Sequence, residues 1–294
     1  MSTNFGRVVI VFNPNSTGDG PGNARELCEQ LSERLPGTAV ELSETQHAGH
    51  AEQLAEEAIA QNPATLVVSA SGDGGYHEVV NGVMRARRRS PGAGVAAVLA
   101  SGNANDHANA VQHRPLVDAV VAGAVSPMDL LEVSTPGKEP RYAHSYVGLG
   151  ITPVAAAELN QHDLDAVKET LLVVRSFWRY RPLSITHDGN RIKLDSLVFA
   201  NIGRMAKYAT LAEDSSTTDG RYESLLIRHR NKLKLLASFL RVVSGKHEFI
   251  TRSEPYVFTT ETPMPLQMDG EVHEFDAGAE VTVRCVRGAL DIVR

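Results

Sequence analysis

The sequence predicts an α/β fold in which a parallel sheet, covered by helices on both faces, is followed by an antiparallel, strand-rich second part. Over the first 130 residues, short apolar runs alternate with helix-length amphipathic stretches, and strands that are joined through helices lie parallel. Beyond residue 130, strand-like runs follow one another, which favours antiparallel pairing. We therefore expect two closely joined domains, residues 1–130 and 131–294, with a ligand cleft between them.

The first domain is predicted to contain four strands and four main helices. Each strand candidate is a short apolar run followed by Gly, Pro, Asn or Ser. The strands are expected at residues 8–12, 39–42, 66–69 and 95–99, and the helices at residues 23–35, 51–61, 76–89 and 115–124. Parallel sheets bind ligands at the carboxyl ends of their strands, so the loops after these strands are the candidate site.

The second domain is predicted to be mainly β-structure. Strand-like runs are expected at residues 141–147, 192–200, 221–227, 256–260 and 279–286, and two helical stretches at residues 152–174 and 232–243. No internal repeat or low-complexity linker separates the two parts of the sequence.

Charge and composition exclude several classes of protein. The chain has 29 Lys and Arg against 35 Asp and Glu, a net charge of −6, and no part is basic enough to predict nucleic acid as a partner. Its two cysteines, Cys28 and Cys285, indicate a reduced compartment. A long-range disulfide between them remains an alternative. No run approaches the roughly 18 apolar residues of a membrane span. These features predict a cytoplasmic protein whose contact with a membrane, on its inner face, is peripheral.

Two glycine-rich loops are candidates for binding phosphate. Residues 13–24 hold Gly18, Gly20 and Gly22 before a helix, but the spacing is GxGxG and no Lys is present, so a surface turn remains an alternative. Residues 69–83, SASGDGGYHEVVNGV, hold three glycines around Asp73, also before a helix. The second loop suits a phosphate and its Mg²⁺ better, although a tight turn capped by Asp73 remains an alternative.

Two further segments add polar side chains to the predicted cleft. Residues 100–111 place Ser101, Asn103, Asn105 and Asp106 after the fourth strand, where they could bind a ligand. Residues 267–275 place Asp269 and Glu271 two apart, so in an extended segment both carboxylates face the same side and could share acid–base work. The alternative for this last segment is a hairpin turn with Asp-Gly at its tip.

Taken together, these segments resemble the diacylglycerol kinase catalytic domain superfamily, which includes bacterial lipid kinases and sphingosine and ceramide kinases. The GGDGTxxEVxNG element of the family appears as residues 71–82, and its GTxND element as residues 102–106. Residues 128–130, MDL, resemble the element whose Asp joins a metal-linked network, and Asp219 with Gly220 resembles its metal-binding turn. Residues 269–271, DGE, match the element that supplies the proposed base.

The resemblance implies a Rossmann-like nucleotide-binding domain joined to an antiparallel β-sandwich that takes a lipid, with ATP and Mg²⁺ in the cleft. It implies transfer of the γ-phosphate to a lipid hydroxyl, most readily that of diacylglycerol. It implies catalytic roles for Glu271, Asp73 and Asp269, nucleotide contacts by Asn13, Thr45, Gly72, Gly74, Gly75, Glu78, Gly102, Asn103, Asn105 and Asp106, and metal contacts by Asp219 and Asp129. A sphingoid-base or other lipid-alcohol kinase, an NAD kinase and a non-catalytic binding module remain alternatives.

The sequence departs from the family pattern in ways that bear on its ligands. Gly75 replaces the Thr of GGDGT and Asn103 replaces the Thr or Ser of GTxND, so two nucleotide-contacting hydroxyls are missing. Residues 228–252 carry seven Lys or Arg and one Glu, with apolar residues at helical spacing. This segment, and the Arg- and aromatic-rich residues 175–182, could lie on an anionic bilayer or pack on the protein's own sheet. The sequence is also compatible with a homodimer.

Overall fold

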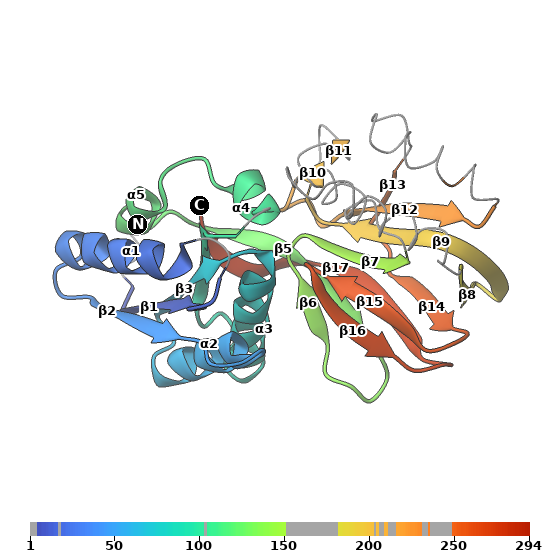
Figure 1. Ribbon diagram of the computed structural model, residues 1–294, viewed down its shortest axis with the longest axis horizontal. Coiled ribbons are helices and arrows are strands. Elements are labelled where there is room, and N and C mark those ends of the chain that lie inside the picture. Colours follow the sequence, from blue (N-terminus) through green and yellow to red (C-terminus); the bar gives the residue numbers. More distant parts are fainter. Residues whose placement is uncertain are drawn as a thin grey trace.

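The computed structural model describes residues 5–16, 19–102, 105–150, 182–202, 204–205, 209–210, 216–230, 235 and 249–294. Within these residues, one sheet of fifteen strands runs through the molecule, with helices gathered at one end and antiparallel strands at the other (Figure 1). The fold class predicted from the sequence is therefore confirmed.

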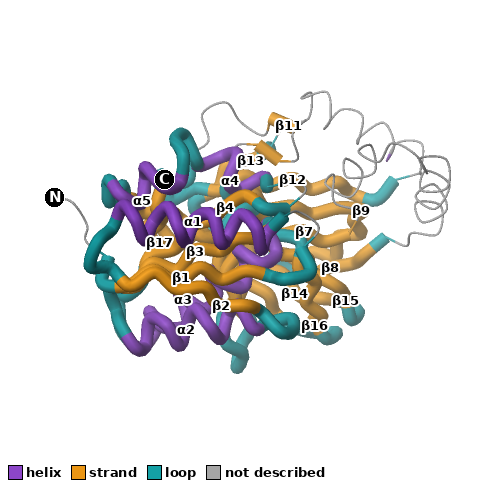
Figure 2. The backbone as a smooth tube through the Cα atoms, turned by 60° about the vertical axis from the view of Figure 1, so that its left-hand side comes forward, coloured by secondary structure: helices purple, strands orange, loops and turns teal. Residues whose placement is uncertain are grey.

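The amino-terminal part is a parallel sheet of four strands in the order β4-β3-β1-β2. The strands are β1 (Arg7–Phe12), β2 (Ala39–Glu44), β3 (Thr65–Ser71) and β4 (Val95–Ala100). The helices are α1 (Gly20–Arg34), α2 (His50–Gln61), α3 (Asp73–Arg89), α4 (Asp106–Val111) and α5 (Leu116–Val121). Helices α1 and α5 pack on one face of the sheet, and α2 and α3 pack on the other (Figure 2). Ala108 and Val111 of α4 belong to the same core cluster as α2 and α3.

Strand β3 shows why both faces are covered. All seven of its residues are buried. Leu66 and Val68 pack in the cluster beneath α1 and α5, whereas Val67 packs in the cluster beneath α2 and α3. The continuous apolar run that predicted a central strand is therefore required by contacts on both sides.

The carboxyl-terminal part is built from antiparallel strands around a single core. Its strands are β5 (Val125–Ser134), β6 (Arg141–Ala143), β7 (Tyr146–Gly150), β8 (Leu183–His187), β9 (Asn190–Ala200), β10 (Arg204–Met205), β11 (Ala209–Thr210), β12 (Tyr222–Arg228), β13 (Ile250–Arg252), β14 (Tyr256–Thr260), β15 (Met264–Met268), β16 (Glu271–Phe275) and β17 (Glu280–Val293). In β14 the side chains of Tyr256 and Phe258 are buried and Val257 is exposed, the alternation expected of a sheet with one covered face.

Strands β5 and β17 belong to both parts of the molecule. Their antiparallel ladder runs from the helical end into the strand-rich end, and residue 130 lies inside β5 (Figure 1). The far end of β17 also pairs in parallel with β4, through Ile292 and Ala96. The two parts are thus joined by continuous sheet rather than by a linker.

Two differences from the predicted elements concern the second part. Residues 141–147 are not one strand, because the chain leaves the ladder at His144 and Ser145 before β7 begins. The predicted helix at 152–174 lies outside the described residues, as does the one at 232–243 except for Leu235. Within the described part of the chain, no helix is long and apolar enough to cross a membrane. Both cysteines are free thiols.

Candidate active site

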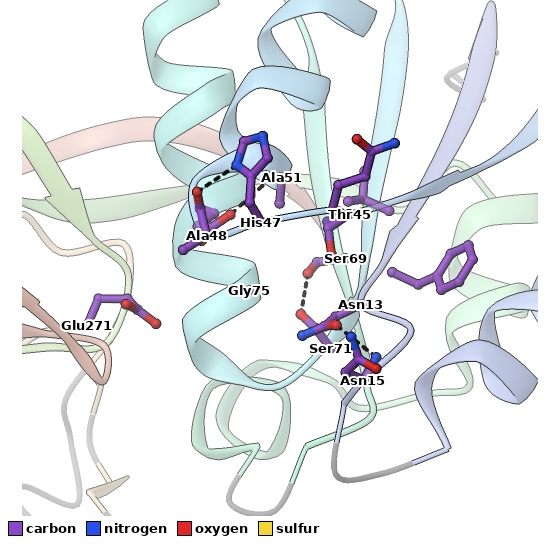
Figure 3. Close-up of a pocket in the computed structure, with 14 residues that line it drawn as sticks. Asn13, Asn15, Thr45, His47, Ala48, Ala51, Ser69, Ser71, Gly75 and Glu271 are labelled. Atoms are coloured by element: carbon purple, nitrogen blue, oxygen red, sulfur yellow. Dashed lines mark hydrogen bonds between the residues drawn. The ribbon is translucent and has the colours of Figure 1, made fainter.

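A cleft of about 370 Å³ lies where the carboxyl ends of β1 and β3 face the strand-rich part (Figure 3). Its lining comes mainly from the loops after β1, β2 and β3, and Glu271 of β16 reaches it from the other half of the molecule. The lining residues are Val11, Phe12, Asn13, Asn15, Thr45, Gln46, His47, Ala48, Ala51, Ser69, Ser71, Gly75, Glu78 and Glu271. The cleft therefore has a mixed polar and apolar lining, to which the strand-rich part contributes Glu271.

The amino terminus of α3 forms the wall of this cleft beside β3. The helix begins at Asp73, three residues earlier than predicted, so its first turn contains Gly74 and Gly75. Its N-cap is Gly72, and no side chain caps the first turn. The unpaired N–H groups of a helix start, with the positive end of the helix dipole, form a ready site for a phosphate.

The amino terminus of α1 is different, because its own cap occupies it. The carboxylate of Asp19 accepts a hydrogen bond from the N–H of Gly22 at 3.1 Å. Gly18, the first glycine of the predicted loop, lies outside the described residues. Of the two glycine-rich loops, the one before α3 is thus better placed to bind phosphate.

The loops after β3 and β4 converge, as predicted. The Ser101 N–H donates to the Ser71 carbonyl at 3.2 Å, and a Cβ on Gly102 would lie 2.5 Å from the Gly72 Cα, so the two backbones touch. The Asp73 carboxylate accepts from the N–H groups of Asp106 and His107, both at 3.2 Å. Asp73, which the resemblance assigns to catalysis, therefore holds the start of α4 against α3.

Asn105 closes the loop after β4 through hydrogen bonds to Gly102. Its φ is 51°, its Oδ1 accepts from the Gly102 N–H at 2.9 Å, and its Nδ2 donates to the Gly102 carbonyl at 2.7 Å. Asn103, between them, lies outside the described residues. Asn105 and Gly102 thus shape the loop, and neither lines the cleft as the structure has it.

Glu78 lines the cleft and also fixes its rim. Its carboxylate accepts from the N–H groups of Gly49 at 2.7 Å and Ala51 at 3.0 Å, and so caps the start of α2. The segment just before α2 carries Thr45 and His47, which line the opposite wall (Figure 3). Glu78 therefore positions these residues relative to α3.

Glu271 is the carboxylate that reaches the cleft from the strand-rich part. It is the first residue of β16, its side chain is exposed, and it points toward α3 (Figure 3). A Cβ on Gly74 would lie 2.6 Å from its Oε1, so the glycine at this position makes room for the carboxylate. The structure thus places Glu271 at the amino terminus of α3.

Asp269 does not share the cleft with Glu271, because the segment forms the alternative named above, a hairpin turn with Asp-Gly at its tip, and not one extended strand. Its φ is 50°, because it lies in the turn between β15 and β16, and the alternation of an extended strand does not apply there. It is buried, and its carboxylate accepts from His77 Nδ1 and from the N–H groups of His144, Ser145 and Tyr146, at 2.9 to 3.1 Å.

These contacts control the charge of Asp269. Burial alone would raise its pKa, but His144, the hydrogen bond from His77 and the backbone donor outweigh burial and hold the pKa well below its usual range. The same contacts hold the backbone of His144 and Ser145, the two residues between the end of β6 and the start of β7. An ionised Asp269 thus pins the turn that carries Glu271 to α3 and to the β6–β7 junction.

Asp129 and Asp219, the predicted metal ligands, lie near one another, and their carboxylates accept hydrogen bonds from backbone N–H groups. The carboxylate of Asp129 is buried and accepts from the N–H groups of Gly220 at 2.6 Å and Gly288 at 2.7 Å. Asp219 accepts from the Arg221 N–H at 2.9 Å. Among the described residues, no group of three His, Cys, Asp or Glu could hold a metal ion. The metal contacts of Asp129 and Asp219 therefore stay a prediction, and backbone hydrogen bonds hold both carboxylates in place.

Two histidines near α3, the buried His107 and the half-buried His273, are expected to make the protein acid-labile. Burial lowers the pKa of His107 well below 6.5 and that of His273 to about 4. Unfolded, both rings take a proton as the pH falls below 6.5, whereas folded they do not until lower pH, so the free energy of unfolding falls between pH 6.5 and about 4. Urea unfolding at several pH values measures the slope of the free energy of unfolding against pH.

The variants His107→Gln and His273→Gln should each make the slope shallower, by at most about 1.4 kcal/mol per pH unit. His113→Gln, at an exposed position, is the matched control and should leave the slope unchanged. If the free energy of unfolding kept the same dependence on pH in both His107→Gln and His273→Gln, these histidines would not be the cause of the acid lability.

Comparison with known proteins shows which class of protein has this arrangement. Residues 7–133 match the family model described as the diacylglycerol kinase catalytic domain. A relative from Bacillus subtilis (strain 168), named diacylglycerol kinase, is 26% identical over 293 residues, 90% of this chain and 89% of the relative. One of the same name from Staphylococcus aureus (strain MRSA252) is 25% identical over 299 residues, 90% of this chain and 86% of the relative.

Solved structures share the fold over nearly the whole chain. A crystal structure of a diacylglycerol kinase from Bacillus anthracis str. Sterne superposes with a TM-score of 0.70 at 17% identity, covering 100% of this chain and 98% of that one. The solved structures show the fold alone, whereas the family match and the named relatives support a lipid kinase, an enzyme with a nucleotide substrate. Residues 7–133 are thus the part of the chain that matches the diacylglycerol kinase catalytic domain family.

The cleft contains only part of the predicted site. Asn13, Thr45, Gly75, Glu78 and Glu271 line it, and Gly72 and Gly74 lie at the helix start beside it. The other described residues of the predicted set, Asp73, Gly102, Asn105, Asp106, Asp129, Asp219 and Asp269, do not line it. The lining residues that the site prediction missed include Asn15, Gln46, His47 and Ser69, which follow or end strands but carry no motif of their own.

Proposed function

We propose that the protein transfers the γ-phosphoryl group of ATP to the hydroxyl of diacylglycerol. The observation that carries the proposal is the placement of Glu271 against Gly74, at the uncapped amino terminus of α3. The relatives that match nine-tenths of this chain are named diacylglycerol kinase, which supports diacylglycerol as the acceptor. ATP would enter as its complex with Mg²⁺, which proteins usually bind through the substrate phosphates and one or two carboxylates.

The chemistry follows from the two sides of the cleft. The N–H groups at the start of α3 receive the phosphates, and the polar residues after β1 and β2 receive the rest of the nucleotide. Glu271 accepts the proton of the lipid hydroxyl while the hydroxyl oxygen forms a bond to the γ-phosphorus. The bond from the γ-phosphorus to the β,γ-bridging oxygen breaks, and ADP leaves. In such a transfer, positioning and electrostatic stabilisation supply most of the catalysis.

A lipid acceptor requires the protein to meet a membrane surface, and we propose that it does so peripherally. The basic segment at residues 228–252, which suggested this from the sequence, lies largely outside the described residues. Sedimentation with vesicles of phosphatidylcholine, alone or with an anionic phospholipid, measures the association directly.

The test of the proposed function is a panel of acceptors. Purified protein with ATP and Mg²⁺ is given dispersed diacylglycerol, sphingosine, ceramide and, separately, NAD, and the products are identified by mass. Phosphatidic acid as the main product supports the proposal. A phosphorylated sphingoid base or NADP as the main product replaces it with that activity, and nucleotide binding without any phosphorylated product indicates a binding module.

A further inference from the structure

Ser71 and Gly75 occupy one space in the wall of the cleft. Ser71 is the last residue of β3, and Gly75 is the third residue of α3. A Cβ on Gly75 would lie 2.3 Å from the Ser71 Oγ and 2.7 Å from its Cβ. Because Gly75 is helical and has no positive φ, a clash rather than backbone conformation requires glycine there. A side chain at position 75 and the Ser71 hydroxyl therefore exclude each other.

This contact links two positions at which the chain differs from the GGDGT form of the family element. In GGDGT the first residue is Gly and the fifth is Thr, whereas this chain has Ser71 and Gly75 at these positions. The hydroxyl has not been lost from the cleft, because Ser71 places its Oγ beside the site of a residue-75 Cβ. The two substitutions together move the hydroxyl from the helix to the end of the strand.

The Ser71 hydroxyl is held in place but can still donate to a ligand. Its Oγ lies 2.6 Å from the Ser69 Oγ, where either oxygen can donate, and it donates to the Gly72 carbonyl at 3.1 Å (Figure 3). Both serines are buried and both line the cleft. When Ser69 donates to Ser71, the Ser71 proton is free to turn from the Gly72 carbonyl to a new acceptor.

We propose that Ser71 donates a hydrogen bond to a phosphate oxygen of the bound nucleotide, oriented by Ser69, and so replaces a side chain at position 75. The neighbouring start of α3 has no side-chain cap, so a phosphate there would lie next to this hydroxyl. The inference rests on the proposed function, since it specifies how the same cleft recognises its nucleotide.

The experiment compares Ser71→Ala, Gly75→Thr and the double variant Ser71→Gly/Gly75→Thr with the parent. The dissociation constant for ADP is measured by calorimetry and the thermal midpoint by scanning fluorimetry. Ser71→Ala should weaken binding about tenfold, the loss typical of a hydrogen bond to a charged group. Gly75→Thr should weaken binding and lower the midpoint, because its Cβ overlaps Ser71.

The double variant should bind ADP within about threefold of the parent. Removing the Ser71 side chain makes room for Thr at position 75, and the Thr then supplies a hydroxyl to the cleft from α3. Ser32→Ala, on the outer part of α1, is the control and should bind like the parent. Parent-like binding by Ser71→Ala, or no recovery in a folded double variant, would overturn the inference. Failure of the parent itself to bind nucleotide or phosphorylate an acceptor would instead overturn the proposed function.

Discussion

The variant Glu271→Gln is expected to lower the rate of phosphoryl transfer by about 10²- to 10⁴-fold, the range that general-base catalysis contributes. Gln keeps the size of the side chain against Gly74 but cannot accept the proton of the lipid hydroxyl. ADP affinity should change little, because the start of α3 and the residues after β1 and β2 stay in place. Steady-state rates with diacylglycerol and calorimetry with ADP measure the two effects separately.

Glu274→Gln is the matched control for this variant. It removes the same charge from the same strand at an exposed position and should leave the rate unchanged. If Glu271→Gln retained the parent rate while Glu274→Gln lowered it, the base would have to lie elsewhere on β16. If both retained it, the carboxylate at the helix start would have no part in the chemistry.

The variant Asp269→Asn is expected to lower the free energy of unfolding by about 3 kcal/mol, as the loss of one partner from a buried charged network does. The amide NH₂ of Asn would face donors from His77, His144, Ser145 and Tyr146, which now share an ionised carboxylate. Urea unfolding at pH 7 measures the loss. Asp276→Asn, an exposed carboxylate near Lys138, is the control and should cost less than about 0.5 kcal/mol.

A double-mutant cycle separates this network from general loss of stability. His77→Asn and Asp269→Asn together should cost less than the sum of the single variants, because the first substitution already removes the bond that the second would break. Additive losses would show that His77 and Asp269 do not support each other. The folded single variants should also transfer phosphate more slowly, since the turn carrying Glu271 loses its anchor.

The arrangement of strands and helices in the first part could be predicted from the sequence because local patterns determine it. The apolar runs of β1, β3 and β4 and the helical stretches between them appear at nearly the predicted residues. The start of α3 was placed three residues late, since glycines give no helical signal although they can form a first turn. The break between β6 and β7 could not be predicted, because the carboxylate that holds it is distant in the sequence.

The candidate site shows the same division between local and distant causes. Glu271 and the glycines of α3 were predicted because they belong to motifs, and the structure brings them together. Asp269 was expected to face the cleft because an extended chain alternates, but the turn gives it a positive φ and buries it. The contribution of Ser71 could not be seen from spacing, because it depends on the contact between a strand end and a helix start.

The ladder between β17 and β4 has a consequence for how the molecule acquires its fold. Ile292 pairs with Ala96, so the edge of the parallel sheet at β4 is completed by a segment far along the chain. Pairing of such distant segments slows folding, because a large loop must close before the contact forms. A fragment ending near residue 130 would leave β4 with an unpaired edge open to other chains. The parallel sheet of the first part therefore depends on β17 to pair the edge of β4.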